Sequence, residues 1–209
     1  MARKAVVANE IGAPAVVPRP EAIRRKTRTT FLFAGRLLGW KGVHLALEAL
    51  NQAIKRGADV ELVVVGDGDM RDVLLARAQV LGIADRLTLK ARVPQAELMA
   101  LYHQADAFLF PSLHDSSGNV VLESLSRGLP VICLDLGGPR QFLTEACGRV
   151  VSTNGASYEG LIGRLADEVV AFAELGDAAR QSLHDAAIRQ ASLLTWAHQV
   201  EQVYGTLVP

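Results

Sequence analysis

The chain has 209 residues, with 22 basic and 22 acidic side chains, and half of its residues are hydrophobic. That length suits one domain with a sizeable core, and the apolar content excludes intrinsic disorder. The balanced charge excludes the broad positive field that drives nucleic-acid binding, and no apolar run approaches the roughly 20 residues that cross a bilayer. We therefore expect a globular protein without a nucleic-acid partner or a transmembrane segment.

The two cysteines, Cys133 and Cys147, have neither a zinc nor a redox spacing, and Cys133 lies within an apolar run. Buried reduced thiols fit a cytoplasmic location. The first residues do not read as a secretory signal, because Asn9 and Glu10 interrupt the apolar stretch. We expect a cytoplasmic protein.

Residues 1–28 contain prolines and the basic run Arg24-Arg25-Lys26 without a helical or strand period, which is typical of an interdomain linker or N-terminal arm. From residue 29, short β-branched or aromatic runs alternate with longer amphipathic stretches, the pattern of βα units around a parallel sheet. The expected strands are 30–34, 60–65, 87–89, 107–110, 130–134 and 148–151. The expected helices are 43–54, 70–81, 95–104, 119–127, 158–175, 177–194 and 195–207.

The expected strands are almost continuously apolar, which means that both faces of the sheet are covered. The sequence therefore predicts an α/β fold: a doubly wound, Rossmann-like parallel sheet of about six strands with helices on both faces. We expect residues 29–194 to form this domain and 195–209 to form a C-terminal return helix. In the helix at 70–81, the expected buried stripe is Met70, Val73, Leu74, Ala78 and Leu81.

In open α/β sheets, ligands bind beyond the carboxyl ends of the strands, so the loops after the strands hold the candidate site. The loop at residues 35–42 carries Arg36 and Lys41 and three glycines, at the N-terminus of a helix. The helix dipole, free N–H groups and two cations describe an anion site. An ordinary glycine-rich turn with solvated cations fits this loop equally well.

Two common nucleotide motifs are missing from the sequence. Gly66-Asp67-Gly68 follows a strand, but Arg71 stands where a dinucleotide fingerprint has its third glycine. No lysine has the context of a Walker phosphate loop. A Rossmann dehydrogenase and a P-loop kinase are therefore disfavoured.

The loop after the fourth strand places Asp115 and Glu123 on either side of a Ser-Ser-Gly-Asn turn. Carboxylates accept hydrogen bonds from sugar hydroxyls, while the helix N-terminus and the loop at 35–42 would neutralise phosphate. Glu123 is not a capping-box partner, because Val120 lies three positions after Ser117. The arrangement can hold both ends of one ligand.

Six motifs follow one another between residues 29 and 155. They are Phe33-Ala34-Gly35-Arg36-Leu37 with Lys41-Gly42, Val64-Val65-Gly66-Asp67-Gly68, Ala105-Asp106 with Pro111-Ser112, Asp115 with Gly118-Asn119-Val120-Val121-Leu122-Glu123, Gly128-Leu129-Pro130-Val131, and Gly137-Gly138-Pro139. In this order and spacing they resemble the C-terminal, donor-binding domain of GT-B fold glycosyltransferases of group 1, family 4.

The resemblance implies a domain that binds a nucleotide-sugar donor for a retaining transferase that needs neither metal nor cofactor. By that likeness Arg36 and Lys41 bind the diphosphate, Glu123 the ribose hydroxyls and Asp115 the donor sugar. Backbone near Arg92 and Val93 would read the base. The implied catalytic residues are Asp115 and Glu123; the implied substrate-binding residues are Gly35, Arg36, Lys41, Arg92, Val93, His114, Ser117, Gly118, Asn119, Val120 and Glu123. For His114, a capping or packing role fits as well as donor contact.

The sequence departs from the family pattern in two ways. Asp115 stands where the family usually has Glu, which shortens the sugar-side acid by one methylene. GT-B enzymes also have an N-terminal acceptor-binding domain, and no residues before the first strand could form one. We expect an excised donor-binding half that is inactive alone, whose parent enzyme contacts a membrane, if at all, through Arg24-Arg25-Lys26. A stand-alone nucleotide or phosphometabolite binding module and a nucleotide-sugar epimerase are the alternatives.

Overall fold

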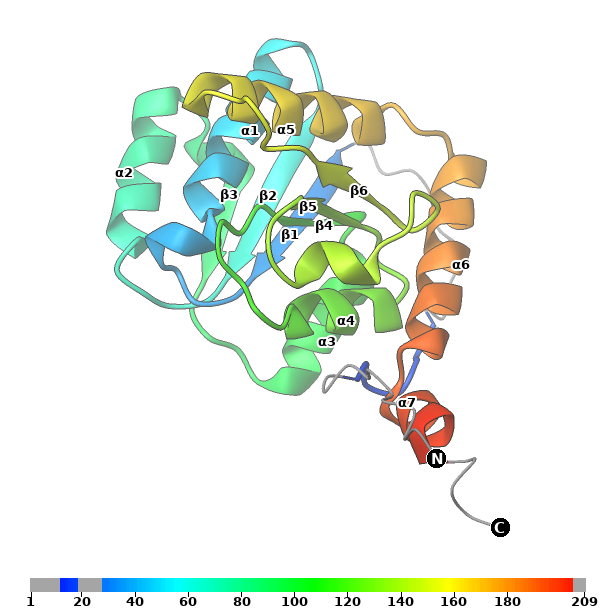
Figure 1. Cartoon of the computed structure of the whole chain (residues 1–209). Coiled ribbons are helices and arrows are strands. Elements are labelled where there is room, and N and C mark those ends of the chain that lie inside the picture. Colours follow the sequence, from blue (N-terminus) through cyan, green and yellow to red (C-terminus); the bar gives the residue numbers. More distant parts are fainter. Residues whose placement is uncertain (1–11, 19–27, 205–209) are drawn as a thin grey trace.

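A six-stranded parallel sheet lies between two layers of helices in the computed structural model of the chain, which describes residues 12–18 and 28–204 (Figure 1). The strands are β1 (Thr29–Ala34), β2 (Val60–Val65), β3 (Leu87–Lys90), β4 (Ala107–Phe110), β5 (Val131–Leu134) and β6 (Gly148–Val151). Their order is β3-β2-β1-β4-β5-β6, so the winding reverses between β1 and β4. Ligands of such sheets bind at this switch point, beyond the carboxyl ends of the strands.

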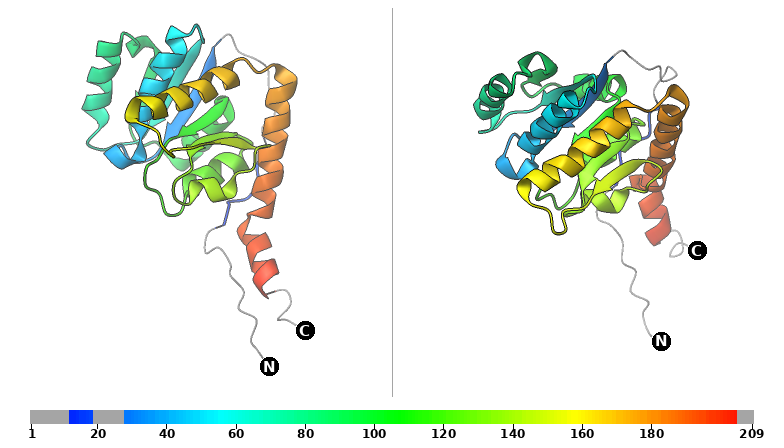
Figure 2. Two further views of the ribbon diagram at one scale, coloured as in Figure 1. Left: turned by 45° about the horizontal axis from the view of Figure 1, so that its top comes forward. Right: turned by 90° about the horizontal axis from the view of Figure 1, so that it is seen from above.

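The helices confirm the expected doubly wound architecture. They are α1 (Val43–Lys55), α2 (Arg71–Leu81), α3 (Gln95–Gln104), α4 (Asn119–Ser126), α5 (Tyr158–Ala173), α6 (Asp177–Leu193) and α7 (Trp196–Tyr204). Helix α5 returns across the sheet to lie along α1, and α3 and α4 lie on the other side (Figure 1). Helix α6 packs against α4, and α7 extends away from the sheet (Figure 2).

The central strands are buried along their whole length, as their continuous apolar sequence predicts. Every residue of β1, β4 and β5 is buried. Aromatic rings tie these strands together: Phe33 of β1 lies 5.6 Å from Phe110 of β4, measured between ring centroids. Burial of such rings is a large stabilising contribution, so the strand ends that carry the loops are firmly fixed.

The expected apolar stripe of α2 is wrong at one position. Leu74 and Ala78 are buried, but Val73 is 53% exposed. Helix α2 lies at the margin of the helical layer, beside α1 (Figure 1). A helix covered along one side buries a narrow stripe, and Val73 falls on its flank.

Buried charges occupy the amino end of the sheet, opposite the candidate site. Arg180 of α6 is 3% exposed and lies 3.5 Å from Asp106, which is 2% exposed, between the Nη1 and Oδ1 atoms. The Arg180 guanidinium also donates to the carbonyls of Phe172, Ala173 and Leu175, where α5 ends. Arg180 therefore satisfies carbonyls that a helix C-terminus leaves without intrahelical partners.

The described part of the expected N-terminal linker is docked on the domain. Ala13 is 2% exposed, forms a parallel bridge with Thr195 and donates its N–H to the Leu194 carbonyl. The Val17 N–H donates to the Ser126 carbonyl at the end of α4. The basic run Arg24-Arg25-Lys26 and the end of the expected return helix lie outside the described residues. Within residues 12–18 and 28–204, no helix has both the length and the apolar character of a membrane span.

Candidate functional site

Two loops that follow the neighbouring strands β1 and β4 are locked together. The β1–α1 loop (residues 35–42) ends at Gly42, whose φ of +70° lies in the left-handed region. A Cβ added there would stand 1.9 Å from the Pro111 carbonyl oxygen. The Trp40 carbonyl accepts hydrogen bonds from the Leu113 N–H at 2.8 Å and the Ser112 hydroxyl at 3.2 Å. Only glycine fits this contact, and the contact fixes the loop that carries both predicted cations.

The β4–α4 loop (residues 111–118) is joined in turn to the loop after β5. The Gly138 N–H donates to the Asp115 carbonyl at 2.9 Å. Gly137 has a φ of +66°, and an added Cβ would stand 2.3 Å from that same carbonyl oxygen. The glycines of the Gly137-Gly138-Pro139 motif therefore allow two backbones to touch.

Asp67 joins the β2–α2 loop to the loop before α3. Its carbonyl accepts the Leu37 N–H at 2.9 Å, and its carboxylate Oδ2 accepts the Arg92 N–H at 2.9 Å. The Gly66-Asp67-Gly68 motif, which is no dinucleotide fingerprint, thus ties the predicted base-reading backbone to the β1–α1 loop. Sequence reasoning missed this role. Its only signal was an acid between two glycines at a strand end.

The two predicted cations, Lys41 and Arg36, differ in whether the protein itself supplies a partner for the side chain. The Lys41 Nζ lies 2.6 Å from Asp115 Oδ2, with the two side chains 21% and 10% exposed. The Arg36 side chain is exposed and has no hydrogen bond or ion pair with any residue that the structure describes. Lys41 is therefore held in place by Asp115. The N–H donors of the Arg36 guanidinium are not used by any described residue and can bind a ligand.

Asp115 is engaged by three donors from the protein. Its Oδ2 accepts Lys41, and its Oδ1 accepts the N–H groups of Ser117 at 3.1 Å and Gly118 at 2.8 Å. Burial opposes ionisation, but the Lys41 hydrogen bond and charge and the two N–H donors outweigh it and lower the pKa of Asp115. A carboxylate accepts about four hydrogen bonds, so Oδ2 keeps one free position.

Glu123 lies one turn into α4 and is half-buried. Its Oε2 accepts a hydrogen bond from the Tyr102 hydroxyl at 3.3 Å. Burial raises the pKa of Glu123, and the donors Tyr102 and Gln95 and the Arg127 charge reduce that rise only in part.

Glu123 faces an open cleft of about 610 Å³ between α3, α4, α7 and the N-terminal segment. The lining residues are Gly12, Pro14, Gln95, Met99, Asn119, Glu123, Arg127 and Trp196. This cleft could take a polar ring with hydroxyl groups next to the N-terminus of α4.

The structure brings only some of the predicted site residues into direct contact. Lys41 meets Asp115, whose carboxylate holds the turn at Ser117 and Gly118, and Asn119 shares the cleft with Glu123. Among the described residues, no side-chain hydrogen bond or ion pair joins the remaining predicted residues to that group. Gly35 starts the β1–α1 loop, His114 is exposed in the β4–α4 loop, Val120 is half-buried in α4, and Arg92 and Val93 precede α3. No described contact joins Arg36 or Arg92 to Glu123.

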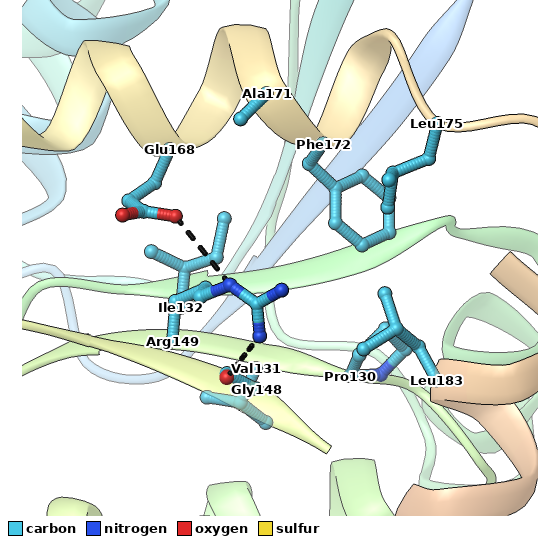
Figure 3. A pocket seen from close by; sticks show the side chains of 10 residues that line it. All are labelled: Pro130, Val131, Ile132, Gly148, Arg149, Glu168, Ala171, Phe172, Leu175 and Leu183. Atoms are coloured by element: carbon cyan, nitrogen blue, oxygen red, sulfur yellow. Dashed lines mark hydrogen bonds and ion pairs between the residues drawn. The ribbon is translucent and has the colours of Figure 1, made fainter. Parts of the chain in front are cut away.

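Other parts of the molecule offer weaker candidates. A cavity of about 60 Å³ lies at the amino ends of β5 and β6, where Arg149 Nε is 3.8 Å from Glu168 Oε2. Figure 3 shows the side chains that line it. Its other walls are apolar, among them Phe172 and Leu183, and it contains none of the predicted site residues. Among the described residues, no three His, Cys, Asp or Glu side chains are grouped as a metal site would need.

Comparison with known proteins identifies the family of the chain. The family model described as glycosyl transferases group 1 matches residues 19–180, more than half of the chain. The 2-deoxystreptamine glucosyltransferase of Streptomyces kanamyceticus is 31% identical over 182 residues, which cover 83% of this chain and 45% of that protein. The D-inositol 3-phosphate glycosyltransferase of Corynebacterium diphtheriae is 28% identical over 184 residues, covering 83% and 41%. The chain thus spans less than half the length of these relatives.

Solved structures share the fold at low sequence identity. The pneumococcal O-GlcNAc transferase GtfA, solved in complex with UDP and GlcNAc, superposes with a TM-score of 0.80 at 16% identity. The match covers 94% of this chain and 38% of that one. WaaG, a glycosyltransferase involved in lipopolysaccharide biosynthesis, gives a TM-score of 0.69 at 24% identity over 91% of this chain and 55% of its own.

Proposed function

Because the chain belongs to the group 1 glycosyltransferases, we propose that it is the nucleotide-sugar donor-binding half of a retaining, metal-independent transferase. The observation that carries this proposal is the ion pair between Lys41 of the β1–α1 loop and Asp115 of the β4–α4 loop. The second cation of the β1–α1 loop, Arg36, has no side-chain partner among the described residues. A lysine held in place and an unpaired guanidinium on one loop suit the diphosphate of a sugar donor.

The proposed chemistry places charge where these groups lie. As the sugar is transferred, the bond between its anomeric carbon and the diphosphate oxygen breaks, and the electron pair stays on the diphosphate. The acceptor hydroxyl oxygen forms the new bond and loses its proton. Arg36, Lys41 and the first N–H groups of α4 stabilise the negative charge that develops, so no metal is needed for this task.

The two acids have separate proposed tasks. Asp115 orients Lys41 and offers the free position on its Oδ2 to a hydroxyl of the donor sugar. Glu123 accepts hydrogen bonds from the ribose hydroxyls in the cleft, while backbone around Val93 reads the base. The Arg92 N–H is already used by Asp67, so the neighbouring peptide groups must make that contact.

We propose that transfer itself needs a second, acceptor-binding domain. The relatives extend well beyond the part that this chain matches, which supports a division of labour between two domains. The chain is therefore expected to bind a donor without transferring sugar. Sugar transfer by this chain alone would refute that part of the proposal.

Thermal unfolding in the presence of ligands tests donor binding. UDP, GDP or ADP, or one of their sugars, should raise the unfolding temperature, because a ligand that binds only the folded state stabilises it. AMP, which has a single phosphate, and NAD, whose diphosphate joins two nucleosides instead of a nucleoside and a sugar, serve as controls. Equal protection by AMP and NAD would favour a general nucleotide-binding module, and no protection by any diphosphate would refute the proposal.

A further inference from the structure

Tyr102 places a polar group deep inside the domain. The side chain belongs to α3, is 0% exposed, and its ring lies 5.6 Å from that of Phe108 in β4. Its hydroxyl reaches α4, 3.3 Å from Glu123 Oε2 and 3.4 Å from the Val120 carbonyl oxygen. A buried phenol needs an acceptor, and it has a single hydrogen to donate.

Glu123 has a long side chain whose orientation must be fixed before it can hold a ligand. A glutamate side chain loses much of its rotamer freedom when it is held in one conformation. A buried hydroxyl that holds the carboxylate before a ligand arrives removes much of that loss from binding. Among the described residues, the other polar or charged groups around Glu123 are Gln95, at the start of α3, Arg127, after α4, and Asn119, which lines the same cleft.

We propose that Tyr102 is a positioning residue that holds the Glu123 carboxylate toward the cleft for recognition of vicinal ribose hydroxyls. This inference rests on the function proposed above. Oε2 accepts the Tyr102 hydrogen and, like Oε1, retains capacity for a hydroxyl of the ligand. Tyr102 touches neither the sugar nor the diphosphate and acts only through Glu123.

The hydrogen bond also sets the pH range in which Glu123 can act. Burial raises the pKa of Glu123, and the Tyr102 hydrogen bond is the largest of the contributions that oppose the rise. Loss of the hydroxyl raises the pKa further, because the ionised form loses a donor. Ribose recognition, which needs the ionised acid to accept two hydroxyl hydrogens, then fails at a higher pH.

Tyr102→Phe removes the hydroxyl and keeps the buried ring. The measured quantity is the affinity ratio between the best-bound of UDP, GDP and ADP and its 2′-deoxy analogue, between about pH 4 and 8. We expect Tyr102→Phe to reduce this ratio by roughly tenfold at neutral pH. The pH at which the ratio falls to half its maximum should also move upward. Tyr158→Phe, the same change at a 52% exposed tyrosine of α5, should leave ratio and midpoint unchanged.

Further readouts separate the possible failures. Unchanged affinity for inorganic pyrophosphate shows that the variant is folded and that its anion loop is intact, and carbon-13 NMR of Glu123 reports its pKa directly. If Glu123→Gln abolishes the preference for the ribonucleotide while Tyr102→Phe leaves both the affinity ratio and its pH midpoint unchanged, Tyr102 does not position Glu123, and the proposed function stands. If Glu123→Gln leaves the ratio unchanged, the ribose site fails, and this inference fails with it.

Discussion

Replacing Gly42 by alanine should destabilise the domain, because Gly42 stands where the β1–α1 and β4–α4 loops touch. The left-handed conformation, with φ at +70°, costs a residue with a Cβ roughly 1–2 kcal/mol. The added Cβ would also stand 1.9 Å from the Pro111 carbonyl oxygen, and backbone relieves such a clash only by moving. Overpacking of this kind costs about 1–3 kcal/mol, so we expect a total loss of about 2–5 kcal/mol.

Urea unfolding measures this loss, and pyrophosphate titration shows whether the loop still binds an anion. Gly39→Ala is the matched control, since Gly39 lies in the same loop, has no positive φ and has nothing within 4 Å of an added Cβ. Alanine there restricts the unfolded chain and should leave stability unchanged or raise it by up to about 1 kcal/mol. A Gly42→Ala variant as stable as Gly39→Ala would refute the reasoning.

Three further substitutions test other parts of the account. The pKa of Glu123 is raised in the folded state, so its ionised form destabilises the protein at neutral pH, and this cost disappears as the pH falls through that pKa. Glu123→Gln should therefore be at least as stable as wild type near neutral pH, and any increase in its urea midpoint over wild type should shrink as the pH is lowered. An increase that grows as the pH is lowered would contradict a raised pKa of Glu123. Arg180→Met removes the positive charge that is paired with the buried Asp106 carboxylate and the donor of the carbonyls at the end of α5, and it should cost about 3–5 kcal/mol in urea unfolding. A loss below about 1 kcal/mol would show that the pair adds little. Asp67→Ala removes the acceptor of the Arg92 N–H and should weaken nucleoside diphosphate more than pyrophosphate in calorimetry; equal weakening would exclude a role in base reading.

The fold could be predicted because its signals are local. The runs that become β1, β4 and β5 are apolar at nearly every position, and this pattern is typical of strands covered on both faces. Helical stripes and glycines mark the intervening helices and their ends. Val73 shows the limit, because a stripe gives the face of a helix but not how much of that face a neighbour covers.

The contacts of the site could not be predicted, since they join residues far apart in the sequence. Lys41 and Asp115 are 74 positions apart, and Tyr102 and Glu123 are 21 apart. Each pairing depends on how two loops or helices meet, which no local pattern records. The residue types at the strand ends could be read from the sequence, and their expected roles came from the family resemblance. That the Asp115 carboxylate already accepts hydrogen bonds from the protein is visible only in the structure.

Calorimetric titration of a nucleoside diphosphate into wild type, Arg36→Ala and Lys41→Ala tests the central claim most directly. Each substitution removes a charged hydrogen-bond donor and should weaken binding by roughly 1.5–3 kcal/mol. Lys41→Ala should be the more damaging, because it also leaves the Asp115 charge uncompensated beside the ligand. Lys55→Ala, at the far end of α1, controls for the loss of one surface charge and should bind like wild type. Equal affinity in wild type, Arg36→Ala and Lys41→Ala would contradict the proposed diphosphate site.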